Sequence, residues 1–224
     1  MPIRKPVPAI LPWLTALAAA PLVLIVAAVA AVRFGGVDLS VGYDLLTWTV
    51  ARALAWVCLA GAVVAVVLAL RDIRGRGAYA LAALVFAGAA VAGFMERQGR
   101  DATPTPRDVT TNVAEPPAFS RAVAALHRGS APASCEAVIA IPSQILAQQA
   151  TSALVDAGFV VNRATTFEVE AAHEGAWFGF VSDAAVRIRP GRTDIRVAAR
   201  DARPDGGATC RLAARIADEL ADAR

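Results

Sequence analysis

Histidine, lysine and cysteine are scarce in this chain of 224 residues, and each shortage excludes a class of site. Lys5 is the only lysine, and His127 and His173 are the only histidines. A histidine general base would have to be one of these two, and a surface histidine is the simpler interpretation of each. No histidine lies near a cysteine at the spacing of a zinc site, and nothing like a nucleophile elbow surrounds Ser182 and Asp183. We therefore predict no metal site, no cofactor and no enzyme.

Charged residues are also few, at 18% of the chain, whereas 57% of the residues are hydrophobic. This composition is too apolar for an ordinary soluble protein, so part of the chain must lie in lipid. Residues 1–100 hold nine Lys/Arg against four Asp/Glu, giving +5, and residues 101–224 hold thirteen against fifteen, giving −2. A slightly acidic polar part lacks the positive surface that supplies most nucleic-acid affinity, so nucleic acid is excluded as a partner.

Three uncharged runs lie in the first hundred residues, at 9–32, 53–70 and 78–95. About 20 helical residues cross a hydrocarbon core roughly 30 Å thick, and the second run can be lengthened if Arg52 snorkels to the interface. The runs predict three transmembrane helices. A cleavable signal peptide is the alternative for the first, but its apolar stretch is too long for one.

Basic residues flank these runs unevenly and predict their orientation. Arg4 and Lys5 precede the first run, and three arginines crowd residues 71–76, so both segments should be cytoplasmic. The first loop, 33–52, balances two arginines against two aspartates and should lie outside. An arginine-rich, alanine-rich composition with one lysine is typical of a bacterial genome of high GC content. We expect a multi-pass protein of the bacterial inner membrane with a cytoplasmic N-terminus and an extracytoplasmic C-terminal domain.

Prolines mark the end of the membrane part. Five of them lie between residues 104 and 132, where they exclude a long helix. We therefore predict a three-helix transmembrane anchor at 1–96, an extended Pro-rich connector at 97–131 and an extracytoplasmic domain at 132–224.

The C-terminal domain has the pattern of mixed strands and helices. Residues 136–141 predict a strand, and Pro142 and Gly158 predict the start and end of a helix, since proline suits a first helical turn and glycine a C-cap. Residues 159–163 and 165–174 predict two more strands.

The clearest periodicity lies at residues 186–200, where apolar side chains alternate with polar ones on both sides of a turn at 190–192. Period two is typical of half-buried strands, and an apolar stripe predicts a last helix at 209–221. We expect an α-helical membrane anchor followed by an α+β domain of two layers, in which two helices cover a mostly antiparallel sheet. The alternation places four arginines on the other face of the sheet: Arg187, Arg189, Arg196 and Arg200.

Two groups of residues carry a family motif. The first group lies in the expected connector and comprises Arg107, Asp108, Val109, Thr110, Thr111, Glu115, Pro116, Pro117, Ala118 and Phe119. The second comprises Trp177, Phe178, Phe180, Asp183, Arg200, Asp205 and Gly207. Together they resemble the bacterial domain of unknown function 1499 in its membrane-anchored form, over roughly residues 105–220 and the three-helix anchor. The resemblance implies no activity, substrate or cofactor.

Cys135 and Cys210 are the only cysteines in the polar domain, because Cys58 lies in the second span. A pair in an oxidising compartment often forms a disulfide, and two buried free thiols are the alternative. A bridge closing about 75 residues would stabilise the domain by roughly 4 kcal/mol in the chain-entropy model.

The arginine face has two interpretations. Cross-strand pairing with Glu168 and Glu170 would make it a solvated structural surface, with Arg200 also oriented by Asp205. Alternatively the arginines form an anion site for phospholipid headgroups or an acidic partner, because the guanidinium fork suits phosphate.

The aromatic run at 177–180 is best interpreted as core, although it can also line a pocket or touch the bilayer. We expect a non-enzymatic interaction domain for an envelope protein or the membrane surface. The alternative is a module that binds a lipid or small apolar ligand, which requires an enclosed cavity.

Overall fold

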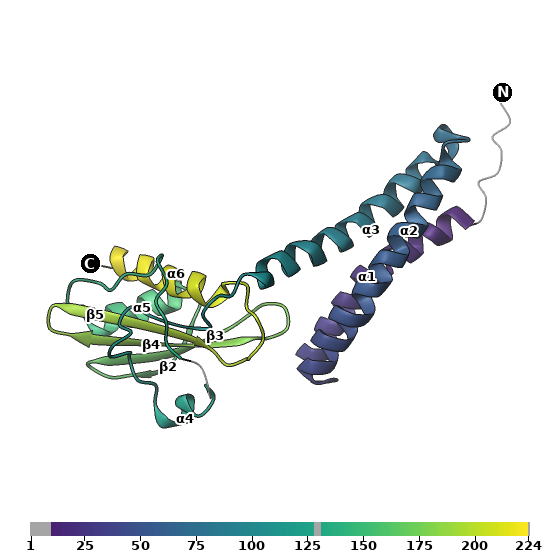
Figure 1. Cartoon of the computed structure of the whole chain (residues 1–224). Helices are drawn as coiled ribbons and strands as arrows, with labels where there is room; N and C mark the ends of the chain where they lie inside the picture. Colours follow the sequence, from purple (N-terminus) through teal and green to yellow (C-terminus); the bar gives the residue numbers. More distant parts are fainter. Residues whose placement is uncertain (1–9, 128–130, 224) are drawn as a thin grey trace. The chain divides into compact units, whose positions relative to one another are not determined.

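The computed structural model describes residues 10–127 and 131–223, which form two compact units, Met1–Gly99 and Arg100–Arg224 (Figure 1). The flanking Arg4 and Lys5, and the first residue of the expected run 9–32, lie outside the described residues.

The first unit consists of α1 (Ile10–Arg33), the π-helical segment η1 (Ser40–Ala51), α2 (Arg52–Ala69) and α3 (Ile73–Ala102). Because η1 runs directly into α2, these elements make three helices that are long and apolar enough to cross a membrane, as predicted. Small side chains let helices pack closely. One buried cluster contains Ala18, Cys58, Ala62, Ala83 and Ala87.

The expected outer loop, 33–52, is largely helical. Helix formation resumes at Ser40, which leaves a short connection after α1. Arg52 lies within the continuous helix, where its Nη2 donates to Oε1 of Gln98 at 3.0 Å and its guanidinium lies 5.8 Å from the centre of the Trp48 ring. This arginine therefore has partners inside its own unit.

The second unit is built on a five-stranded antiparallel sheet of order β1-β5-β4-β3-β2. Its strands are β1 (Asp108–Thr110), β2 (Val160–Ala164), β3 (Glu168–Glu174), β4 (Val181–Arg189) and β5 (Arg192–Ala199). Helices α5 (Ala147–Asp156) and α6 (Ala208–Asp222) cover one face, and the short α4 (Arg121–Ala124) lies on the other (Figure 1). The predicted α+β fold is confirmed.

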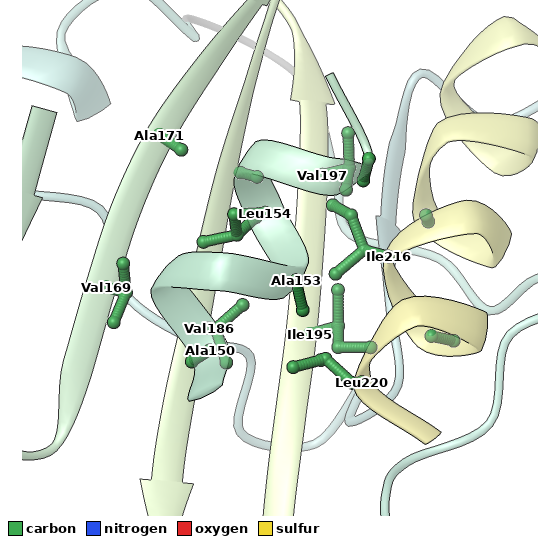
Figure 2. Close-up of a cluster of buried hydrophobic side chains, with 14 of the residues drawn as sticks. Ala150, Ala153, Leu154, Val169, Ala171, Val186, Ile195, Val197, Ile216 and Leu220 are labelled. Carbon is green, nitrogen blue, oxygen red and sulfur yellow. The ribbon is translucent and has the colours of Figure 1, made fainter. Parts of the chain in front are cut away.

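Apolar side chains fill the space between the sheet and the two long helices (Figure 2). Leu154 of α5 and Ile216 of α6 are fully buried against Val186, Ile195 and Val197 of the central strands. The alternation at 186–200 arises from this packing, because every second side chain points into the core.

The segment before α5 differs from the prediction. Residues 136–141 form no regular strand, and Ile141 makes only an isolated bridge to Thr193. Strand β1 pairs with residues 196–198 of β5, so this segment meets only the start of β5 at Thr193. The helix starts at Ala147 rather than at Pro142. It ends at Asp156, and Gly158, predicted to close it, follows two residues later with a φ of 86° that suits glycine.

The expected connector, 97–131, is not a separate extended segment. Helix α3 continues to Ala102, and Asp108–Thr110 supplies the fifth strand of the sheet. Beyond β1, residues 111–127, which we call the strap, cross the sheet and include α4. Strand β1 has only three residues and pairs with residues almost 90 positions later. Its pattern is too short to be recognised in the sequence.

Candidate functional site: the polar face of the sheet

The strap covers the face of the sheet opposite α5 and α6. Phe119 packs on the small side chains of Ala185 and Ala198, with Val123 of α4 beside them. The guanidinium of Arg196 lies 4.6 Å from the centre of the Phe119 ring, a cation–π contact. The outer face of this sheet is therefore a second, smaller packed layer.

Charged side chains are enclosed beneath the strap. Four buried carboxylates lie on this face: Asp108, Glu170, Asp183 and Asp194. A buried charge is costly unless it is paired and hydrogen-bonded. Each of the four has an arginine partner or a backbone N–H donor, so the face is an organised polar layer.

Arg196 ties β1 and the strap to β5. Its Nε and Nη2 donate to the two carboxylate oxygens of Asp108 at 2.9 and 2.7 Å, and its Nη1 donates to the carbonyl of Pro117 at 3.1 Å. A fork-on-fork pair of this kind is directional as well as strong. Arg196 therefore fixes the path of the motif residues between β1 and Phe119.

His127, Asp183 and Arg200 form a second group at the end of the strap. Arg200 donates to both oxygens of Asp183 at 2.7 Å, and Nε2 of His127 lies 2.8 Å from Oδ2 of the same carboxylate. Burial opposes ionisation of Asp183, but the hydrogen bonds from Arg200 and His127 outweigh it, and the pKa is lowered. His127, expected at the surface, has a buried side chain that stacks on Phe119.

A third group surrounds Asp194. Its carboxylate accepts from Arg187, Arg189 and Arg192 at 3.1, 2.6 and 2.6 Å, respectively. Burial opposes ionisation of Asp194, but the hydrogen bonds from the three arginines lower its pKa overall. On the solvent side, Glu115 of the strap contacts Arg189 at 2.6 Å and Arg187 at 3.6 Å. The hydrogen bond from Arg189 is the main reason that the pKa of Glu115 is lowered.

The predicted partners of the arginines need correction. Glu168 pairs with Arg163 at 2.8 Å, and Glu170 accepts from the backbone N–H of Ser120 and lies 3.5 Å from Arg163. Neither glutamate pairs with the four arginines of the alternating strands. The strap largely buries Arg187 and Arg196. It leaves Arg189 and Arg200 partly exposed. The position of the strap depends on contacts between residues far apart in the sequence.

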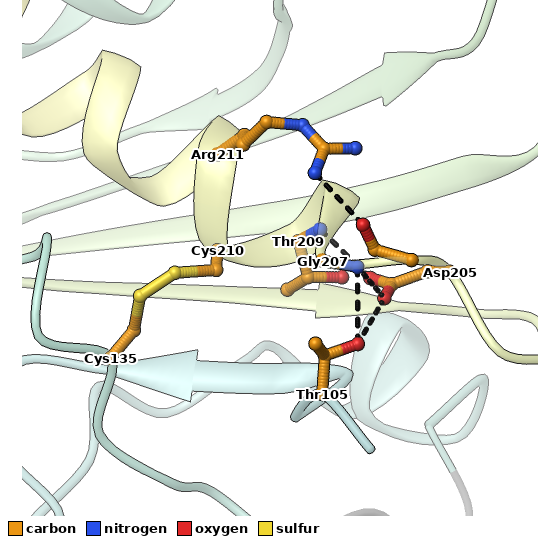
Figure 3. Close-up of a disulfide and its surroundings, with 8 residues drawn as sticks. Thr105, Cys135, Asp205, Gly207, Thr209, Cys210 and Arg211 are labelled. Atoms are coloured by element: carbon orange, nitrogen blue, oxygen red, sulfur yellow. Dashed lines mark hydrogen bonds between the residues drawn. A yellow bond between two sulfur atoms is a disulfide. The ribbon is translucent and has the colours of Figure 1, made fainter. Parts of the chain in front are cut away.

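Asp205 caps α6 instead of pairing with Arg200 (Figure 3). Its carboxylate accepts from the backbone N–H groups of Gly207 and Thr209, both at 2.8 Å, and from the hydroxyl of Thr105 at 3.0 Å. Burial opposes ionisation of Asp205, but these hydrogen bonds lower its pKa overall. The physical reason is local: unpaired N–H groups at a helix start attract a carboxylate.

A disulfide joins Cys135 to Cys210 of α6, with the Cα atoms 6.1 Å apart (Figure 3). Both cysteines pack against the main core. The bridge ties the irregular segment before α5 to α6, and Cys58 is a free, buried thiol in the first unit.

The remaining candidate residues have separate places. Nδ1 of His173 donates to the carbonyl of Gly158 at 2.7 Å, and the ring packs on Phe159, away from His127. Phe178 is buried, whereas Trp177 is largely exposed, so only part of the aromatic run joins the core. Within residues 10–127 and 131–223, no three His, Cys, Asp or Glu side chains gather in a way that could hold a metal.

The fold and the polar layer define a class: three helices long and apolar enough to cross a membrane, followed by an α+β domain whose sheet is packed on both faces. Residues 108–220 match the model of the family described as Protein of unknown function (DUF1499), and the chain belongs to that family. Comparison with curated proteins and with solved structures finds no match.

The structure explains why the motif residues occur together. Asp108, Glu115 and Phe119 lie in β1 and the strap, and they contact arginines of β4 and β5. Sequence reasoning missed the role of Asp194, although its position on the same face as the arginines was an available signal. It also missed His127, for which no local pattern exists.

Proposed function

We propose that this protein is an integral protein of the bacterial inner membrane whose C-terminal unit is a non-enzymatic interaction domain on the extracytoplasmic side. An odd number of spans places the two ends of the chain on opposite sides of the membrane. The arginines at 71–76 favour a cytoplasmic second connection, which directs α3 outward. The Cys135–Cys210 bridge supports the same side, because disulfides persist in oxidising compartments.

The observation that carries the interaction role is the open outer edge of the sheet. Strand β2 is the last strand on its side, and Val160 is 71% exposed. Phe167 and Trp177, in the turns before and after β3, are also largely exposed. An open strand edge pairs readily with an extended segment of another protein, and exposed side chains of the strand such as Val160 add specificity.

The core supports this role over a module for a lipid or small apolar ligand. Such a module needs an enclosed cavity, whereas buried side chains fill the space between the sheet and α5 and α6. A hollow between the start of α5 and the turn at 164–166 is open and lies at the surface. No chemistry-bearing group of the polar layer lines it.

Two experiments test the proposal. A periplasm-active reporter should be active when fused after Ala221 and inactive when inserted near Gly75. The reverse pattern would refute the orientation.

A photo-crosslinking residue at Val160, in cells that retain their membranes, should give a discrete adduct with one protein. The matched control is Asp218, an exposed residue of α6, which should give none. Equal labelling at both positions, or none at Val160, would refute a docking role for β2.

A further inference from the structure

Arg187, Arg189 and Arg192, which we call the arginine cradle, converge on Asp194 from two adjacent strands. Asp194 is fully buried, at 0% exposure, so an anion from solvent cannot take the place of its carboxylate in the folded domain. It holds the three guanidinium groups together before any ligand arrives. Arg189 and Arg192 remain partly exposed. The cradle is therefore preorganised and reaches the surface.

Glu115 lies on the outer side of the cradle. Its side chain is 65% exposed, and its carboxylate meets Arg189 and Arg187 through separate oxygens. It belongs to the strap, where its backbone N–H is held by Oδ1 of Asn112 at 3.0 Å and its carbonyl accepts from Arg187 at 2.5 Å. An exposed ion pair contributes little to stability, so releasing this carboxylate costs the fold little.

The cradle has more donors and more charge than its two carboxylates use. Three cations face two anions, which leaves one net positive charge, or two when Glu115 swings away. Each guanidinium carries five N–H donors. Nε of Arg187 is buried and has no acceptor among the described side chains and backbone. A phosphate group carries up to two charges and more acceptor oxygens than a carboxylate, and it suits the guanidinium fork.

We propose that the arginine cradle is a phosphate-binding site and that the carboxylate of Glu115 occupies it until a phosphate group displaces it. The ligand is either free phosphate or the phosphodiester headgroup of an anionic phospholipid, because both present negatively charged non-bridging phosphoryl oxygens. This inference goes beyond the proposed interaction role and depends neither on the orientation in the membrane nor on the β2 edge.

The test uses the full chain in neutral detergent at low ionic strength, titrated with inorganic phosphate in a calorimeter. Glu115→Gln removes the competing charge and should bind phosphate about ten-fold more tightly, whereas Arg189→Gln removes a charge-assisted donor and should bind about ten-fold more weakly. The matched control is Arg211→Gln on α6, across the sheet, which should bind as the original chain does. Tighter binding by Glu115→Gln cannot result from misfolding.

A second arm separates the two sources of phosphate. The chain in phosphatidylcholine nanodiscs is mixed with vesicles of phosphatidylcholine alone or with phosphatidylglycerol, and co-flotation is measured. Binding that requires phosphatidylglycerol and is stronger for Glu115→Gln assigns the site to a lipid headgroup. Phosphate binding without vesicle binding assigns it to free phosphate. If Glu115→Gln and Arg189→Gln match the original chain in both arms, the proposal is wrong.

Discussion

Replacing Arg200 by alanine should destabilise the C-terminal unit by about 2 kcal/mol. Asp183 is only 1% exposed and accepts two hydrogen bonds from Arg200 and one from His127. Removing one partner of a buried ion pair costs about 3–5 kcal/mol, because an uncompensated charge remains. The Arg200 side chain is 35% exposed, so solvent screens the charge that remains, and His127 keeps its contact with Asp183. We therefore expect a loss of about 2 kcal/mol, below that range.

The assay is thermal unfolding of a fragment of residues 100–224, the second compact unit, followed by circular dichroism. A loss of about 2 kcal/mol should lower the melting temperature by roughly 6–10 °C for a domain of this size. Arg200→Ala combined with Asp183→Ala should cost little more than Arg200→Ala alone, because the two side chains share one interaction. Arg211→Ala, at an exposed position on α6, is the control and should change stability by less than about 0.5 kcal/mol.

The pH dependence of the fragment's stability provides an independent check on Asp183. The folded-state pKa of Asp183 is lowered, so the stability that it contributes is present above its unfolded pKa of about 3.9 and is lost as the pH falls through the folded value. The original fragment should therefore lose stability below about pH 4, and Arg200→Ala should show a shallower loss. Additive effects in the double variant, or a loss no larger than that of Arg211→Ala, would contradict the pairing of Arg200 with Asp183.

The other predictions concern α6 and its bridge. Thiol labelling of the oxidised, denatured protein should modify only Cys58, and labelling of Cys135 or Cys210 without reduction would show that the bridge is absent. Reduction, or Cys135→Ala with Cys210→Ala, should destabilise the fragment by roughly 4 kcal/mol, measured by urea unfolding; an unchanged midpoint would contradict a stabilising bridge. Asp205→Ala should lower the free energy of unfolding by about 1–2 kcal/mol, because the helix cap is lost. Asp205→Asn should lower it less, because asparagine also caps helices. Equal losses for the two variants would indicate that the charge of Asp205, rather than capping, dominates.

The polar layer illustrates where sequence reasoning succeeds and where it fails. Alternation placed Arg187 and Arg196 on the face opposite Val186 and Ile195, because a strand has a strict period of two. The alternation could not predict which carboxylates these arginines pair with. Arg196 meets Asp108 across 88 positions, and the contact exists only because β1 pairs with β5.

Short and irregular elements were the weakest part of the prediction. Residues 136–141 have the apolar content of a strand but make only the isolated bridge between Ile141 and Thr193, whereas Asp108–Thr110 is too short to be noticed and is nevertheless paired. Strand formation depends on a partner, and the partner is chosen by the whole fold. Helices satisfy their own backbone groups, so α6 was located to within one residue at each end.

The sequence by itself determined the three apolar helices, the two-layer α+β class and the face on which each alternating side chain lies, because span length and periodicity are local properties. The tertiary structure alone decided that the strap covers the second face of the sheet, that Asp183 pairs with Arg200 and His127, and that Glu115 meets the arginine cradle. These contacts depend on segments distant in sequence being brought together by the folded chain. A buried charge then takes whichever partner the fold places within reach.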